Sequence, residues 1–221
     1  MKAHSSYSLF DAESIWSILL RIAPPVMLAQ LIQAMYNIVD SYFVGKFSGD
    51  GLTALSIVYP VQLIVTAIAV GTGVGVNTLM SRYDGQGNRH LADHAAGTGT
   101  VLALVSWLLF AIVSGLLMGP FAAASTDSPS VAEHAITYGT IVCVGSLGVF
   151  LESTWSKVHQ ARGNMRLPML AQIAGAVTNI VLDPILIFGL GPMPELGVAG
   201  AAYATVAGQV LSALIVSSGL R

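Results

Sequence analysis

Residues 167–190 read LPMLAQIAGAVTNIVLDPILIFGL, and this stretch decides the class of fold. Its single charged residue is Asp183, which interrupts a run that is otherwise free of charge. A helix needs about 20 consecutive, mainly apolar residues to cross a bilayer, so the stretch predicts a membrane-spanning helix. Because a carboxylate inside a bilayer is costly, Asp183 requires a partner or a function.

The whole chain of 221 residues is too apolar for a soluble domain. Hydrophobic residues make up 54% and charged residues 9%, with a mean hydropathy of +0.74. A soluble domain carries roughly 25% charged residues because its surface faces water. We therefore expect a lipid bilayer around most of the surface. The net charge of −2 gives no indication of nucleic-acid binding, and the single cysteine, Cys143, excludes an internal disulfide.

Charge-free stretches of similar length recur along the chain and predict six membrane-spanning helices. Their approximate positions are 14–43, 53–81, 94–118, 133–158, 167–190 and 197–220. The expected fold class is therefore all-α, a polytopic membrane protein. We expect residues 1–221 to form a single six-helix transmembrane lobe.

The distribution of lysine and arginine predicts the orientation in the membrane. One side of the predicted bundle carries eight basic residues, Lys2, Arg21, Arg82, Arg89, Lys157, Arg162, Arg166 and Arg221, and the other side carries Lys46. Cytoplasmic loops are enriched in lysine and arginine, so both termini should be cytoplasmic. We expect a multi-pass protein of the cell (inner) membrane.

Two of the predicted helices carry a polar stripe that ends in a carboxylate. Helix 14–43 has Gln30, Gln33, Asn37 and Asp40, and helix 167–190 has Gln172, Asn179 and Asp183. These spacings place each set on one helical face. Lipid cannot satisfy such groups, so both stripes should face protein or water.

The two carboxylates are expected at the same depth. Each lies roughly 25–28 Å beyond a cytoplasmic arginine, Arg21 for Asp40 and Arg166 for Asp183, at about 1.5 Å per residue. If their helices are neighbours, one carboxylate would take up a proton or both would hold a cation. The alternative is that Asp40 marks the outer end of its helix and Asp183 caps a short one.

Neutral oxygens and prolines accompany the two acids. Asn37 and Asn179 carry amide oxygens of the kind that hard cations accept. Pro184 removes a backbone donor and so frees the carbonyl of Ile180. We expect Pro184, and Pro25 in helix 14–43, to bend their helices, although such prolines can also be packing features.

Glu152 lies toward the cytoplasmic end of predicted helix 133–158. It faces either an inner vestibule or the membrane interface, and the sequence leaves both open. An enzyme would need a nucleophile and base, or a metal cluster, at one depth, and we find neither pattern in the sequence. We therefore do not expect an enzyme.

Three longer segments resemble the MATE (multidrug and toxic compound extrusion) family. They are AMYNIVDSYFVGKFSGDGLTALSIVYP (34–60), GVNTLMSRYDGQGNR (75–89), and TNIVLDPILIFGLG (178–191) followed by LGVAGAAYATV (196–206). The segments occur in the family's order and span nearly the whole chain.

The resemblance implies twelve helices in two lobes, with exchange of Na⁺ or H⁺ driving export of organic cations. It implies a cation site at Asp40, Asn179 and Asp183 with Thr205 as a further member, and a bend of the first helix at Pro25. From its place on the polar stripe we also expect Asn37 at this site. We expect Gln33, Tyr36 and Gln172 to line the substrate cavity. We expect no cofactor, only Na⁺ or H⁺ as the coupling ion, and the resemblance implies Asp40, Asn179 and Asp183 as the site for Na⁺.

The resemblance also sets the expected partners. The chain ends at Arg221, where the family continues into a second lobe, so we expect the N-terminal half of an antiporter. Its partners would be a C-terminal lobe or a second copy, and an organic cation or drug-like molecule. One alternative is a lipid-linked oligosaccharide flippase of related fold, which should carry cationic residues in its cavity. Another is a non-transporting membrane scaffold, which would not need two polar stripes.

Overall fold

The computed structural model describes residues 15–191 and 193–220, and within these ranges the chain is helical with no strand. The helices are α1 (Ile15–Phe47), α2 (Gly49–Gly85), α3 (Arg89–Ser125), α4 (Pro129–Val144), α5 (Leu147–Ala161), α6 (Arg166–Phe188) and α7 (Val198–Ser218). The prediction of an all-α chain is confirmed. The predicted helix start at residue 14 and the basic residues Lys2 and Arg221 lie outside the described residues.

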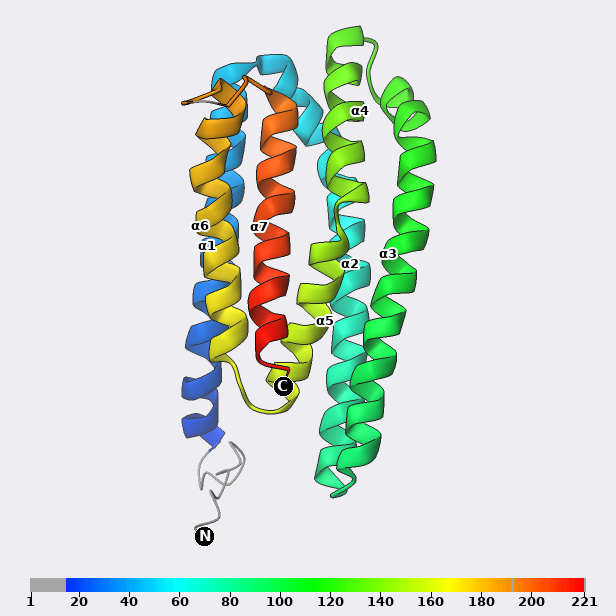
Figure 1. Ribbon diagram of the computed structural model, residues 1–221, viewed down its shortest axis with the longest axis vertical. Helices are drawn as coiled ribbons and strands as arrows, with labels where there is room; N and C mark the ends of the chain where they lie inside the picture. The colour runs from blue at the N-terminus through cyan, green and yellow to red at the C-terminus, as the bar shows by residue number, and fades with distance from the viewer. Residues whose placement is uncertain (1–14, 192, 221) are drawn as a thin grey trace.

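The helices run lengthwise beside one another (Figure 1). The α1–α2, α3–α4 and α6–α7 links lie at one end, and the α2–α3 and α5–α6 links lie at the other. Helix α6 packs against α7 and α1, while α2 packs against α3, α4 and α5. Contacts of α7 with α4 and α5 join these two groups of helices.

The segment predicted as one helix over 133–158 differs from the prediction. It forms two helices, α4 and α5, which meet at an angle of 41°. Side chains satisfy carbonyls at the break: Ser146 Oγ donates to the Cys143 oxygen at 2.7 Å. Trp107 Nε1 of α3 donates to the Val144 oxygen at 3.0 Å. A break at membrane depth is tolerated when its backbone groups find such partners within the protein.

Helices α2 and α3 extend beyond the charge-free stretches that predicted them. The side chain of Ser48 caps α2 by accepting from the Gly51 N–H at 3.1 Å. The side chain of Asn88 caps α3 by accepting from the Leu91 N–H at 3.2 Å. Such caps satisfy donors that the first helical turn leaves free. The apolar stretch therefore marks only the part of each helix that the membrane would cover.

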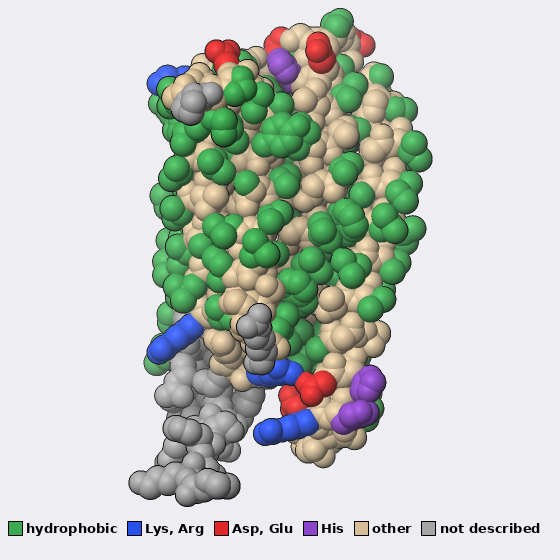
Figure 2. Space-filling view, viewed as in Figure 1, with side chains coloured by type: hydrophobic (Ala, Val, Ile, Leu, Met, Phe, Trp, Pro, Cys, Tyr) green, Lys and Arg blue, Asp and Glu red, His purple; other side chains and the backbone are tan. Residues whose placement is uncertain are grey.

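The surface and the helix lengths are those of a multi-pass membrane protein. Helices α2, α3, α6 and α7 are each long and apolar enough to cross a membrane, and the bent pair α4–α5 is a fifth candidate. Figure 2 shows hydrophobic side chains along the length of the bundle and charged side chains at its two ends. The count of six spans and the cytoplasmic position of the termini stay predictions.

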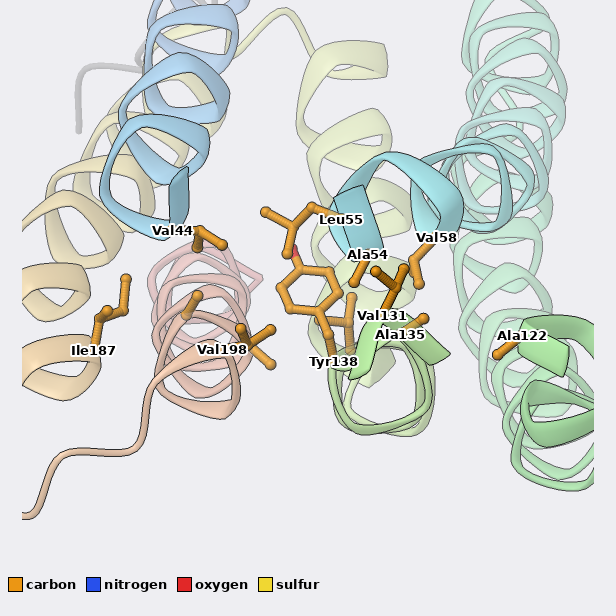
Figure 3. Close-up of a cluster of buried hydrophobic side chains, with 13 residues drawn as sticks. Val44, Ala54, Leu55, Val58, Ala122, Val131, Ala135, Tyr138, Ile187 and Val198 are labelled. Atoms are coloured by element: carbon orange, nitrogen blue, oxygen red, sulfur yellow. The ribbon is translucent and has the colours of Figure 1, made fainter. Parts of the chain in front are cut away.

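A cluster of buried hydrophobic side chains closes the end that carries the α1–α2, α3–α4 and α6–α7 links. Figure 3 shows Val44 of α1, Leu55 of α2, Tyr138 of α4 and Val198 of α7 around this cluster. Each of these side chains is at most 8% exposed. The cluster thus holds helices from both groups together just beyond the predicted polar stripes.

Candidate cation site and polar cavity

Asp40 of α1 is buried and lines a small cavity together with residues of α2, α4 and α7. Its side chain is 5% exposed, and its Oδ1 atom has no hydrogen-bond partner within the described part of the chain. Phe188 of α6 packs edge-on against Phe43 and Phe47 of α1, with ring centroids 6.3 and 6.1 Å apart. These contacts fix the last turns of α1 against α6, so Asp40 faces the protein interior and not lipid.

Asn179 and Asp183 of α6 meet Thr205 of α7. All three residues are at most 4% exposed. The Asn179 amide lies 3.4 Å from Asp183 Oδ1 and 3.2 Å from Thr205 Oγ1. With the amide turned over, Asn179 donates to Asp183 Oδ2 at 3.3 Å and accepts from the Thr205 hydroxyl and N–H at 3.2 and 3.1 Å. We adopt this second orientation because it satisfies every partner.

Two glycines let α6 and α7 approach closely enough for these contacts. A Cβ atom on Gly208 would lie 2.6 Å from the Gly175 oxygen, and one on Gly175 would lie 2.7 Å from the Gly208 oxygen. The two backbones therefore touch directly, as small residues permit between membrane helices. Neither position can accept a side chain without moving a helix.

The structure brings together the predicted cation-site residues from three helices. Asp40 lies on α1 and Asp183 on α6, two helices that pack against each other. Asp40, Asn37 and Thr205 line a small cavity of about 220 Å³. The oxygens available at this place are carboxylate, amide and hydroxyl oxygens, the ligand types that hard cations such as Na⁺ prefer. The described residues contain no cluster of three or more histidine, cysteine or acidic side chains for a transition metal.

A larger cavity of about 630 Å³ adjoins this cluster, and it is lined by α1, α2, α4, α5, α6 and α7. The predicted substrate-cavity residues Gln33, Tyr36 and Gln172 all line it. Gln33 Nε2 donates to the Tyr36 hydroxyl at 3.3 Å. The polar stripe of α1 thus faces the cavity, where lipid does not have to satisfy it.

Both predicted bend prolines lie inside helices. Helix α6 continues through Pro184 as one helix, and a bend there stays a prediction. The backbone of Pro25 belongs to α1, and its side chain lies outside the described residues. A bend of α1 at Pro25 stays a prediction.

Sequence reasoning missed several polar residues that line the cavities. They are Gln62 of α2, Tyr138 of α4, Lys157 of α5 and Gln209 of α7. Tyr138 accepts from Gln62 Nε2 at 3.3 Å. Lys157, which is predicted on the basic side of the bundle, lies in α5 and lines the larger cavity. The sequence feature that could have identified Gln62 and Gln209 as cavity residues is a single glutamine within an otherwise apolar span.

Long apolar helices that enclose a polar cavity with buried carboxylates define a polytopic membrane transport protein. The family model described as MatE matches residues 25–185, and the chain belongs to this family. The MATE resemblance predicted from the sequence is thereby confirmed. Members of the family are transporters, so the prediction that the chain is not an enzyme is confirmed at this level.

Individual relatives agree with the family assignment. The chain is 30% identical over 202 residues to a protein named FAD transporter from Shewanella oneidensis, covering 87% of this chain and 42% of the relative. It is 25% identical over 221 residues to a probable multidrug resistance protein NorM from Thermotoga maritima, covering 96% and 47%. A solved MOP superfamily transporter from Pyrococcus furiosus superposes with a TM-score of 0.86 at 28% identity, covering 92% of this chain and 44% of that one. The chain therefore spans about half the length of the relatives it matches.

Proposed function

We propose that the chain is the N-terminal half of an antiporter that couples the entry of Na⁺ or H⁺ to the export of organic cations or drug-like molecules. One observation carries this proposal. Asp40, Asn179, Asp183 and Thr205 come from three helices, are buried together, and adjoin a polar cavity of about 630 Å³. Two buried acids without a basic partner favour the uptake of a cation or proton between them.

Ion binding is coupled to substrate export because the ion and the substrate bind with different affinities to two arrangements of α1 in the bundle. In the described state Asp40 Oδ1 lies in the protein interior without a donor, which is costly. A cation or proton bound there removes that cost and favours the state in which α1 stays against α6. An organic cation in the cavity would favour another state. Such opposed preferences are what alternating access requires.

The exposed side of α1 supports a partner lobe. Gln30, Gln33 and Asn37 are exposed in this chain, although they lie on a helix otherwise rich in apolar residues. Lipid would leave their amides unsatisfied, whereas a second lobe, or a second copy of this chain, would complete a cavity around them. We place this assembly in the cell (inner) membrane.

A flippase for lipid-linked pyrophosphates is less favoured. Such a cavity should carry several cationic side chains, and Lys157 is the one lysine or arginine on the described cavity wall. Its ammonium donates to Gln160, and Glu152 on the same wall carries a charge that opposes an anion. A non-transporting scaffold would have no use for a cavity flanked by buried acids.

The test is ion-dependent thermal stability of the purified chain in lipid nanodiscs. The melting temperature of the wild type should rise with Na⁺ or with falling pH, since a ligand at ten times its Kd stabilises by about 1.4 kcal/mol. Asp183→Asn should lose this response. The exposed Asp127→Asn in the α3–α4 link is the matched control and should keep it. Identical responses of wild type and Asp183→Asn would contradict the proposal.

A further inference from the structure

A third carboxylate, Glu152 of α5, lines the larger cavity away from Asp40 and Asp183. Glu152 lies in the second turn after the α4–α5 break. Its Oε1 atom accepts from the Ser156 hydroxyl at 2.7 Å, one turn farther along the same helix. This hydrogen bond holds the carboxylate in place but leaves it the capacity to accept further donors. Of the two alternatives that the sequence left open, the structure places Glu152 on a cavity wall.

Two further acceptors on this cavity have no donor. Oε1 of Gln172 on α6 and Oε1 of Gln209 on α7 are buried and have no hydrogen-bond partner among the described residues. Both residues line the same cavity as Glu152. A Cβ atom on Gly148 of α5 would lie 2.9 Å from the Gln209 backbone oxygen, so α5 and α7 touch at this level. Three neighbouring helices therefore each place a residue with an acceptor oxygen on the wall of one cavity.

The one basic side chain on this cavity wall does not occupy the acceptor oxygens of Glu152, Gln172 and Gln209. Among the described lining residues, Glu152 and Lys157 carry the charges. Lys157 Nζ donates to Gln160 Oε1 at 2.9 Å, toward the α5–α6 link. An unsatisfied buried acceptor costs free energy, and a ligand that donates to it recovers that cost.

We propose that Glu152, Gln172 and Gln209 form a ligand subsite that takes the N–H-bearing end of an organic cation, such as a protonated amine, an amidinium or a guanidinium. This inference deepens the proposed function and rests on it. A set of acceptors binds a donor, so the subsite selects N–H groups in addition to positive charge. A quaternary ammonium carries the same charge but offers no donor, and it would leave the two amide oxygens unpaired.

The proposal is tested with two probes that differ only in their donors, 1-naphthylmethylammonium and its N,N,N-trimethyl analogue. Their affinities for the purified chain in nanodiscs are measured by calorimetry. The wild type should bind the primary ammonium about tenfold more tightly, as one to two charge-assisted hydrogen bonds would give. Glu152→Gln should reduce this preference below about threefold. Glu133→Gln, an exposed acid on α4, is the control and should keep it.

A second variant and a second readout keep the outcome interpretable. Gln209→Leu keeps the carboxylate but removes one acceptor, so the preference should fall to an intermediate value. Equal affinity of the wild type for both probes, or binding of neither, would overturn the subsite. The response of the melting temperature to Na⁺ or to pH, measured on the same samples, reports separately on Asp183. If the wild type responded to neither Na⁺ nor pH but kept the preference for the primary ammonium, the coupling proposal would be contradicted and the binding subsite would not.

Discussion

The two polar regions of the bundle are built from the same helix faces but differ in how their groups are satisfied. The outer region, named for its predicted depth, comprises Asp40, Asn179, Asp183 and Thr205. There Asn179 and Thr205 bond to each other and are at most 4% exposed, and among the described side chains of this region Asp40 alone keeps a buried oxygen without a donor. In the cavity region Gln172 lies two turns before Asn179, and Gln209 lies one turn after Thr205, yet both keep a buried acceptor without a donor. Polar groups paired within the protein stabilise the fold, whereas unpaired ones are held ready for a ligand at the expense of stability.

The α6–α7 backbone contact separates these regions, and altering it should have the largest effect. Gly208→Ala places a Cβ atom 2.6 Å from the Gly175 oxygen, so the helices must move apart. We expect a loss of about 1–3 kcal/mol in the free energy of unfolding, as overpacking typically costs. The Na⁺ response and the primary-amine preference should both weaken. Unfolding in nanodiscs and calorimetry measure these quantities.

Gly71→Ala is the matched control for that change. No atom lies within 4 Å of a Cβ atom at this position of α2. Alanine is a better helix former than glycine by about 1 kcal/mol, so this variant should be neutral or slightly stabilised. Equal stabilities of the two variants would mean that the α6–α7 contact does not support both regions.

Asn179→Leu should affect the outer region alone. The change leaves Asp183 and Thr205 without their shared partner, and an unpaired buried polar group costs about 1–3 kcal/mol. We expect that loss of stability in chemical unfolding, together with loss of the Na⁺ response. The preference for the primary amine should remain. Loss of both functions in a folded Asn179→Leu protein would show that the two regions act as one site.

The outer region was largely predictable because its signal is periodic. Residues spaced by four along a helix share a face, and an acid in an apolar span stands out. Asn179 and Asp183 lie side by side as that spacing indicates, and Asp40 lies on α1, which packs against their helix. Their role as a cation site stays a proposal.

The cavity region was less predictable because it depends on contacts between distant segments. The α4–α5 break needs the indole of Trp107, which lies on another helix, to satisfy Val144. The direction in which Glu152 points follows from that break, since a bend reorients every residue beyond it. Tyr138, an aromatic residue in an apolar run, carries no sequence signal that separates a cavity wall from a core.

Tyr138→Phe should lower the free energy of unfolding less than Asn179→Leu does. Tyr138 lies at the boundary between the two polar regions. The hydroxyl of Tyr138 accepts one hydrogen bond from Gln62, and its ring packs in the buried cluster that closes one end of the bundle. Removing the hydroxyl should cost about 0.5–1.5 kcal/mol, the net contribution of one such bond. Chemical unfolding measures it. A larger loss would indicate that Tyr138 also supports Asp40, and the Na⁺ response would then fall as well.

Gln172→Leu should change the free energy of unfolding least. Whether it raises or lowers that free energy is the sharpest test of the difference between the two polar regions. The variant removes a buried acceptor that has no partner and adds apolar surface at a cavity wall. The fold should therefore be unchanged or stabilised by up to about 1 kcal/mol, whereas Asn179→Leu on the same helix destabilises it. Affinity for the primary-amine probe should fall at the same time. If Gln172→Leu instead destabilised the protein as much as Asn179→Leu, Gln172 would be a structural residue, and the distinction between the two regions would be wrong.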